Sequence, residues 1–250
     1  MIDDQLSISH VSVGPAGVWA VGLDGKVYYR EGTYMNDGTR GTAWTEIPGV
    51  NLVQLDVGNR IVWGLTSSGN IYFRTGIEMY NPTGCEWRLV PGFLKDITVS
   101  PMGHVWGVTT FGGMVRRAEV SFLNPEGLYW HSVGPSSIKF SRVSAGCAGV
   151  WGIDENGTVL YRKGTYNDAD TPGSEWIIVP EQLKHVTVGH GRVWGIKGDY
   201  VTYRAGVAQA RPTGVQWDLV YKTLKQFDVW QSALWGADSY DPKQVYARLI

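Results

Sequence analysis

The sequence predicts an all-β fold, a six-bladed β-propeller of four-stranded antiparallel blades. A Trp that follows an apolar residue recurs six times at intervals of 41 to 45 residues, and a second Trp stands between successive members of this series. Repeats of about 40 to 45 residues are typical of propeller blades. The first series is Trp19, Trp63, Trp106, Trp151, Trp194 and Trp235, and the second series is Trp44, Trp87, Trp130, Trp176 and Trp217.

The repeats cover the chain and predict a single domain over residues 1–250. All-β domains of about 200 to 250 residues are common as single units. One repeat can bury its apolar faces only against its neighbours, so the repeats should pack as one ring. The expected repeats, here called first to sixth, are 5–49, 50–92, 93–135, 136–181, 182–222 and 223–250.

Each repeat is expected to hold four short strands. In the fifth repeat, residues 183–189 alternate apolar and polar side chains, and strand-like segments follow at 192–196, 200–204 and 216–220. Tight-turn pairs such as Asp24-Gly25 and Asn156-Gly157 separate the second and third strands. Loops of 12 or 13 residues connect the third and fourth strands, and each loop carries a Gly three residues before the second-series Trp.

The sixth repeat ends early, because no fourth strand follows the third strand, which stops at Arg248. Counting back from the first strand of the first repeat places the missing strand at residues 1–4, with Met1 near the position expected for Trp. We therefore expect residues 1–4 to pair with the strand that ends at Arg248 and to close the ring.

An Arg ends the third strand of every repeat. Trp19 and Arg30 are 11 residues apart, as are the corresponding residues of the next three repeats. A hairpin centred on the turn is expected to bring this Trp and Arg side by side. Both Trp series, the Arg series and the long loops should then share one rim. The Arg series is Arg30, Arg74, Arg117, Arg162, Arg204 and Arg248.

Arg beside Trp suits sugar binding, because an indole covers the apolar face of a pyranose and a guanidinium donates to hydroxyl groups. The same residues also suit architecture, since a large ring fills the wedge between sheets and an Arg can satisfy loop carbonyls. Loop tyrosines are further candidates, although one buried ring can simply anchor a loop. The candidate ligand-binding residues are Trp19, Arg30, Tyr34, Trp44, Trp63, Arg74, Tyr80, Trp87, Trp106, Arg117, Trp151, Arg162, Tyr166, Trp176, Trp194, Arg204 and Trp217.

The repeat unit resembles the tectonin repeat. The motif stands as Trp87-Arg88-Leu89-Val90-Pro91-Gly92 followed by an alternating strand, and it recurs from Trp176 through Val188. The resemblance covers nearly the whole chain and implies a β-propeller similar to tectonins, fish-egg lectins and tachylectins. It further implies binding of surface glycans or bacterial lipopolysaccharide, and some fungal members favour O-methylated sugars. Ala20, Trp230 and the short sixth repeat depart from the family pattern.

Several classes of function are not supported by the sequence. The five His have no metal-ligand spacing, and neither a nucleophile elbow nor a phosphate-binding loop is present, so we expect no enzyme activity, no metal and no cofactor. A net charge of −1 gives no basic surface for nucleic acid. No apolar run approaches the length of about 20 residues that a membrane span requires.

The expected function is that of a multivalent lectin whose partners are glycans on cell surfaces and which acts in defence by agglutination. The alternative is an intracellular β-propeller that serves as a protein-interaction scaffold. Oligomerisation is left open. The first residues do not resemble a signal peptide, which favours a cytoplasmic protein, or a secreted one from which a signal peptide has been removed.

Overall fold

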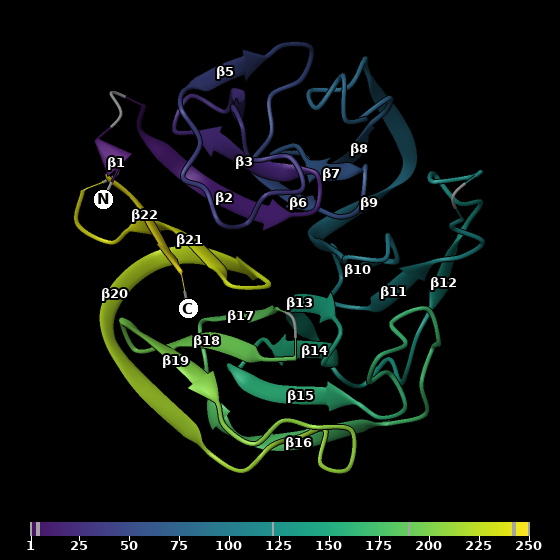
Figure 1. The fold of residues 1–250 in the computed structure, drawn as a ribbon. Helices are drawn as coiled ribbons and strands as arrows, with labels where there is room; N and C mark the ends of the chain where they lie inside the picture. Colours follow the sequence, from purple (N-terminus) through teal and green to yellow (C-terminus); the bar gives the residue numbers. More distant parts are fainter. Residues whose placement is uncertain (1, 4–5, 122, 190, 242–243, 250) are drawn as a thin grey trace.

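The computed structural model describes residues 2–3, 6–121, 123–189, 191–241 and 244–249 (Figure 1). Within these ranges every regular element is a β-strand, and every pairing between strands is antiparallel. The strands are β1 (Ile2–Asp3), β2 (Ile8–Gly14), β3 (Gly17–Gly22), β4 (Val27–Arg30), β5 (Trp44–Ile47), β6 (Gln54–Val57), β7 (Val62–Leu65), β8 (Asn70–Arg74), β9 (Trp87–Val99), β10 (Val105–Thr109), β11 (Met114–Arg117), β12 (Trp130–Ser132), β13 (Phe140–Gly146), β14 (Gly149–Asp154), β15 (Thr158–Arg162), β16 (Trp176–Gln182), β17 (His185–Val188), β18 (Val193–Lys197), β19 (Tyr200–Arg204), β20 (Trp217–Trp230), β21 (Ala233–Asp238) and β22 (Gln244–Leu249).

The strands form four sheets. Two sheets have four strands, in the orders β2-β3-β4-β5 and β13-β14-β15-β16, and two have seven, in the orders β12-β11-β10-β9-β8-β7-β6 and β1-β22-β21-β20-β19-β18-β17. Each seven-stranded sheet contains one long strand that changes partner along its length. β9 pairs with β8 through residues 87–93 and with β10 through residues 94–99. β20 pairs in the same way with β19 and then with β21.

The two ends of the chain meet in one sheet. Figure 1 shows the sheets following one another around a ring, with β22 beside β1. Ile2 pairs with Val245 and Asp3 with Gln244, which is the partner expected for the N-terminal segment; residues 1 and 4 of that expectation lie outside the described residues.

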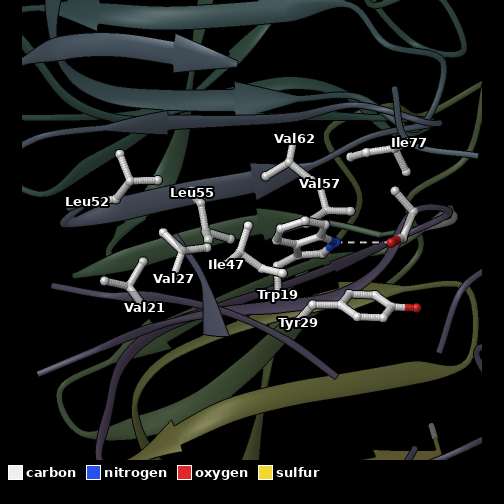
Figure 2. Close-up of a cluster of buried hydrophobic side chains, with 11 residues drawn as sticks. Trp19, Val21, Val27, Tyr29, Ile47, Leu52, Leu55, Val57, Val62 and Ile77 are labelled. Atoms are coloured by element: carbon white, nitrogen blue, oxygen red, sulfur yellow. Dashed lines mark hydrogen bonds between the residues drawn. The ribbon is translucent and has the colours of Figure 1, made fainter. Parts of the chain in front are cut away.

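The first series of Trp residues forms the core. Trp19 is fully buried among aliphatic side chains of the first and second repeats, and its Nε1 donates to the carbonyl of Ala16 at 3.0 Å (Figure 2). The Gly that follows this Trp in most repeats is required by packing: a Cβ on Gly64 would lie 2.4 Å from Leu52 Cδ1. A Leu fills the corresponding space beside Gly107, Gly195 and Gly236, and Phe140 fills it beside Gly152, which explains the Trp-Gly pair.

Polar side chains of the first strands converge on the axis of the ring. A cavity of about 40 Å³ is lined by residues of β2, β6, β9, β13, β17 and β20. The alternation of each strand directs its polar residues to this axis in two layers. The layers are His10, Gln54, Asp96, Arg142, His185 and Gln226, and then Ser12, Asp56, Thr98, Ser144, Thr187 and Asp228.

Candidate functional site

The candidate rim lies where each third strand ends, the long loop follows and the fourth strand begins. The register places Arg74 opposite Val62 and Trp63 opposite Phe73. Because neighbouring residues of a strand face opposite sides of the sheet, Arg74 and Trp63 do not lie side by side as the spacing suggested. The Arg instead pairs with the Trp that opens the fourth strand, as in the pair Arg74 and Trp87.

Five Arg–Trp pairs of this kind repeat around the ring. In each pair the guanidinium carbon lies over the indole, at 5.3 to 5.5 Å from the ring centroid. Such cation–π contacts are stabilising when they are desolvated, and these Arg side chains are only 4 to 8% exposed. The pairs are Arg30–Trp44, Arg74–Trp87, Arg117–Trp130, Arg162–Trp176 and Arg204–Trp217.

The same Arg residues hold the long loops. Arg74 Nε donates to the carbonyl of Thr83 at 2.8 Å, and Arg162 Nε donates to that of Pro172 at 2.7 Å. Arg30, Arg117 and Arg204 make the corresponding bond to a carbonyl just before the loop glycine. Burial lowers the pKa of four of these groups from the usual Arg value. The N–H groups of these buried Arg side chains are therefore directed into the protein, toward the loop carbonyls.

The repeated loop glycine completes this anchor. Gly84 has a φ of 67°, and a Cβ there would lie 2.4 Å from the carbonyl oxygen of Thr75. A side chain at this position is excluded both by backbone conformation and by space. The Arg, the Gly and the second-series Trp thus form one unit that fixes the loop against its sheet, and we call this unit the loop anchor.

The five loops fall into two classes. In the first and fourth repeats the loop has 13 residues and a buried Thr: Thr33 Oγ1 accepts from Val18 N at 2.9 Å and donates to the carbonyl of Arg30 at 2.6 Å. Thr165 makes the same bonds in the fourth repeat. In the second, third and fifth repeats the loop has 12 residues and a pair of backbone hydrogen bonds across its tip, as between Glu78 and Asn81.

Ten of the candidate residues are buried. The first-series indoles are at most 5% exposed, so none offers a face to a sugar. The Arg residues are bound to loop carbonyls and covered by the loops. Their burial and contacts favour an architectural role. These ten residues are Trp19, Trp63, Trp106, Trp151 and Trp194, together with Arg30, Arg74, Arg117, Arg162 and Arg204.

The second-series indoles are half-buried and join neighbouring repeats. Trp87 meets Trp19 edge to face at a centroid distance of 6.4 Å, and Trp217 meets Trp151 in the same way. Trp44 of the first repeat packs on Trp235 of the sixth and so helps to close the ring. Trp176 packs on an aromatic ring of its own repeat and on the cluster that contains the first-series Trp of the third repeat. The candidates Trp44, Trp87, Trp176 and Trp217 keep only part of their surface for a ligand.

The loop tyrosines differ sharply in exposure. Tyr34 and Tyr166, in the longer loop class, are half-buried against neighbouring core clusters. Tyr80, in the shorter class, is 94% exposed and stands beside Met79, which is 64% exposed. In the third repeat Leu123 is 91% exposed at the corresponding tip. Tyr80 was a candidate from sequence, whereas Met79 and Leu123 were missed, although Leu123 occupies the same place between Arg and Gly as Tyr80.

Titratable groups line the axis, and a cavity of about 340 Å³ lies at the layer that contains His10, Asp96 and Arg142. Ser12 Oγ lies 2.7 Å from both Asp56 Oδ1 and Asp228 Oδ2. Burial and the charge of Asp228 raise the pKa of Asp56 to about 7. Arg142 forms an ion pair with the buried Asp96 at 3.0 Å. Among the described residues no three His, Cys, Asp or Glu side chains are arranged to hold a metal ion, and no helix is long and apolar enough to cross a membrane.

Known proteins resemble this chain in sequence and in fold. A family model described as Tectonin domain matches residues 2–93 and 85–239. The Perivitellin-2 31 kDa subunit of Pomacea maculata is 28% identical over 242 residues, which cover 95% of this chain and 84% of that protein.

Solved structures share the fold at low sequence identity. The Cps50 (Swd1) beta-propeller domain of Myceliophteria thermophila gives a TM-score of 0.55 at 8% identity and covers 97% of this chain and 82% of its own. Prp20p of Saccharomyces cerevisiae gives 0.55 at 13% identity, with 85% of this chain and 61% of that chain covered. This chain therefore spans less than two thirds of Prp20p, and these likenesses show the β-propeller fold alone.

Proposed function

Because the chain belongs to the tectonin family, we propose that it is a multivalent lectin that binds glycans on cell surfaces. The observation that carries the proposal is the set of five loop anchors, which present five loops of different sequence from one repeated framework. Loops on a rigid scaffold commonly carry binding residues, while the scaffold carries the fold.

We further propose that the ring consists of six four-stranded blades. Division of β9 and β20 where each changes partner yields six antiparallel groups of four strands, the last completed by β1. The six first strands place equivalent residues in the same two layers at the axis, so they run in the same direction. The five long loops would then emerge on one face of the ring.

On that face, sugars would contact the loop tips and the accessible edges of the second-series indoles. Tyr80 offers the most exposed ring for stacking on a pyranose. O-methylated sugars and bacterial lipopolysaccharide are the targets that the family suggests. Each site alone would be weak, roughly millimolar to tens of micromolar, and simultaneous engagement would raise the overall affinity by about two to four decades. Agglutination in defence is the expected outcome.

The alternative is a propeller that binds other proteins. The exposed apolar tips at Met79, Tyr80 and Leu123 favour it, because contiguous exposed apolar surface often marks a protein contact. A partner protein would bind through these tips without any requirement for sugar.

A glycan array tests the two functions. The full chain is displayed multivalently against sugars that include O-methylated glycans and lipopolysaccharide, and Tyr80→Ala is compared with Tyr221→Ala. Tyr221 is 92% exposed on β20, outside the long loops, and so matches Tyr80 in exposure. We expect saturable glycan binding that weakens in Tyr80→Ala alone. Absence of any bound glycan from a folded, multivalent sample would contradict the lectin proposal.

A further inference from the structure

One contact between repeats lacks the indole that fills the other five. Five core clusters each have a second-series Trp packed against them. The cluster between the fifth and sixth repeats, which contains Trp194, Val201, Leu224 and Leu234, has none among the described residues. Among the described residues the sixth repeat has no such Trp, because β1 pairs with β22 only at Val245 and Gln244 and does not reach Arg248.

A cavity of about 260 Å³ occupies this place. Trp194, Val201, Leu224 and Leu234 line it, and all four are at most 5% exposed. The volume is close to the lower end of small-molecule pockets, about 300 Å³. Because these four side chains are buried, the walls of the cavity belong to the hydrophobic core. The cavity is thus a gap at a position where the other five contacts between repeats hold an indole.

The cationic partner of the missing indole is still present. Arg248 lines the cavity and pairs with Leu234 of β21, as the anchor residue Arg204 pairs with Val193 of β18. Those five are 4 to 8% exposed, whereas Arg248 is exposed and has neither a loop carbonyl nor an indole against it among the described residues. Its guanidinium is thus available to a ligand.

Three of the side chains that line the cavity, Arg192, Lys222 and Arg248, are basic. Lys222 is paired with Asp238 at 2.8 Å and lies over the ring of Tyr246. Arg192 and Arg248 also line the cavity, and neither forms an ion pair with a described residue. Two guanidinium groups that have no ion pair within the described part of the chain, beside an apolar cavity, suit a ligand with one apolar part and one anionic part, because Arg binds carboxylates in a bidentate manner.

We propose that this cavity binds a planar aromatic ring of indole size that carries a carboxylate. The ring takes the place that Trp217 fills beside Trp151 and Arg204, edge-on to Trp194 and flat against Arg248. The carboxylate is held by Arg248 and Arg192. This site is independent of glycan binding on the loops, so either proposal can fail alone.

Titration with indole-3-acetate tests the proposal. The full chain is followed by calorimetry and by the indole N–H signals in its NMR spectrum. We expect one saturable site per chain, a shift of the Trp194 signal, and at least about ten-fold weaker binding of tryptamine, which has the same ring and the opposite charge. No saturable binding of indole-3-acetate, or equal binding of tryptamine, would overturn the proposal.

Variants locate the site. Arg248→Ala should weaken binding at least about five-fold, and Val220→Trp, which puts an indole on the cavity wall, should abolish it. Arg88→Ala is the control, because Arg88 is an exposed Arg on β9 that does not line the cavity. Unchanged binding in a folded Arg248→Ala or Val220→Trp variant contradicts the assignment. Binding that appears only in a chain shortened to start at Leu6 would also contradict the assignment, since the N-terminal segment would then occupy the cavity.

Discussion

Equivalent strands form the contact between the fourth and fifth repeats and the contact between the fifth and sixth repeats. Different side chains lie between the strands in the two contacts. In the first, Trp217 lies under Arg204 and packs edge-on against Trp151. In the second, Trp194 faces a cavity and Arg248 is exposed. The comparison shows that the repeated Arg–Trp pairs fill contacts between repeats, and that a cavity is present beside Trp194, where the described residues include no such pair.

The largest expected effect comes from removing the core indoles. Trp151→Ala should lower the free energy of unfolding by about 3 to 5 kcal/mol, as a large-to-small change in a packed core does. Trp194→Ala should cost at least about 1 kcal/mol less, because Trp194 lacks the edge-to-face partner and already borders a cavity. Urea unfolding of both variants measures the difference. Equal losses would show that the two contacts are packed alike.

Arg204 and Arg248 occupy equivalent positions at the rim, so substitution of each compares the two contacts directly. Arg204→Ala should cost about 1 to 3 kcal/mol, since it leaves the carbonyl of Thr213 without its donor and Trp217 without its cation. Arg248→Ala should change stability by less than about 0.5 kcal/mol, as an exposed side chain does. Thermal and urea unfolding report both values. A costly Arg248→Ala change would mean that the sixth repeat has a loop anchor of its own.

The two contacts also differ at the axis. Val188 N donates to Ser144 Oγ at 2.9 Å across the fourth and fifth repeats, whereas Thr187 donates to the Asp228 carboxylate across the fifth and sixth. Asp228 shares Ser12 with Asp56. The second contact should therefore depend on the ionisation of the Asp56–Asp228 pair, whereas the hydrogen bond to Ser144 includes no titratable side chain.

The raised pKa of Asp56 determines whether the stability of the fold rises or falls with pH. Its pKa is raised from 3.8 to about 7 on folding, so its contribution to stability is complete below about pH 4 and is lost as the pH rises through 7. Relative to the parent, Asp56→Asn should gain at least about 1 kcal/mol of stability between pH 4 and pH 8. Ser144→Ala should instead run parallel to the parent. Urea unfolding across this range measures both, and a gain for Asp56→Asn that falls with rising pH would reverse the assignment.

Much of the fold was predictable from sequence, because the Trp spacing and the turn pairs determine strand order within each repeat. The roles of the rim residues were not. Whether Arg74 meets Trp63 or Trp87 depends on hairpin register, since a shift of one residue moves a side chain to the other face. The burial of Trp87 depends on Trp19 of the preceding repeat, which no pattern within one repeat reveals.

The loop tips and the contact between the fifth and sixth repeats were also not predictable from the pattern within one repeat. Tyr34 and Tyr80 occupy similar places in sequence, but the extra residue and Thr33 draw the first loop onto the core and leave the second loop tip exposed. The cavity beside Trp194 depends on the register of β1 with β22. A segment of two residues carries too little pattern to determine that register.

The central claim is that the buried Arg–Trp pairs hold the loops while the loop tips bind the ligand. The long loop of the second repeat tests this claim most directly. Glycan binding and the free energy of unfolding are both measured for Arg74→Ala and for Tyr80→Ala. The account predicts that Arg74→Ala loses about 1 to 3 kcal/mol of stability, whereas Tyr80→Ala keeps full stability and binds glycan more weakly. An Arg74→Ala variant of unchanged stability that no longer binds glycan, beside a Tyr80→Ala variant that binds normally, would contradict it.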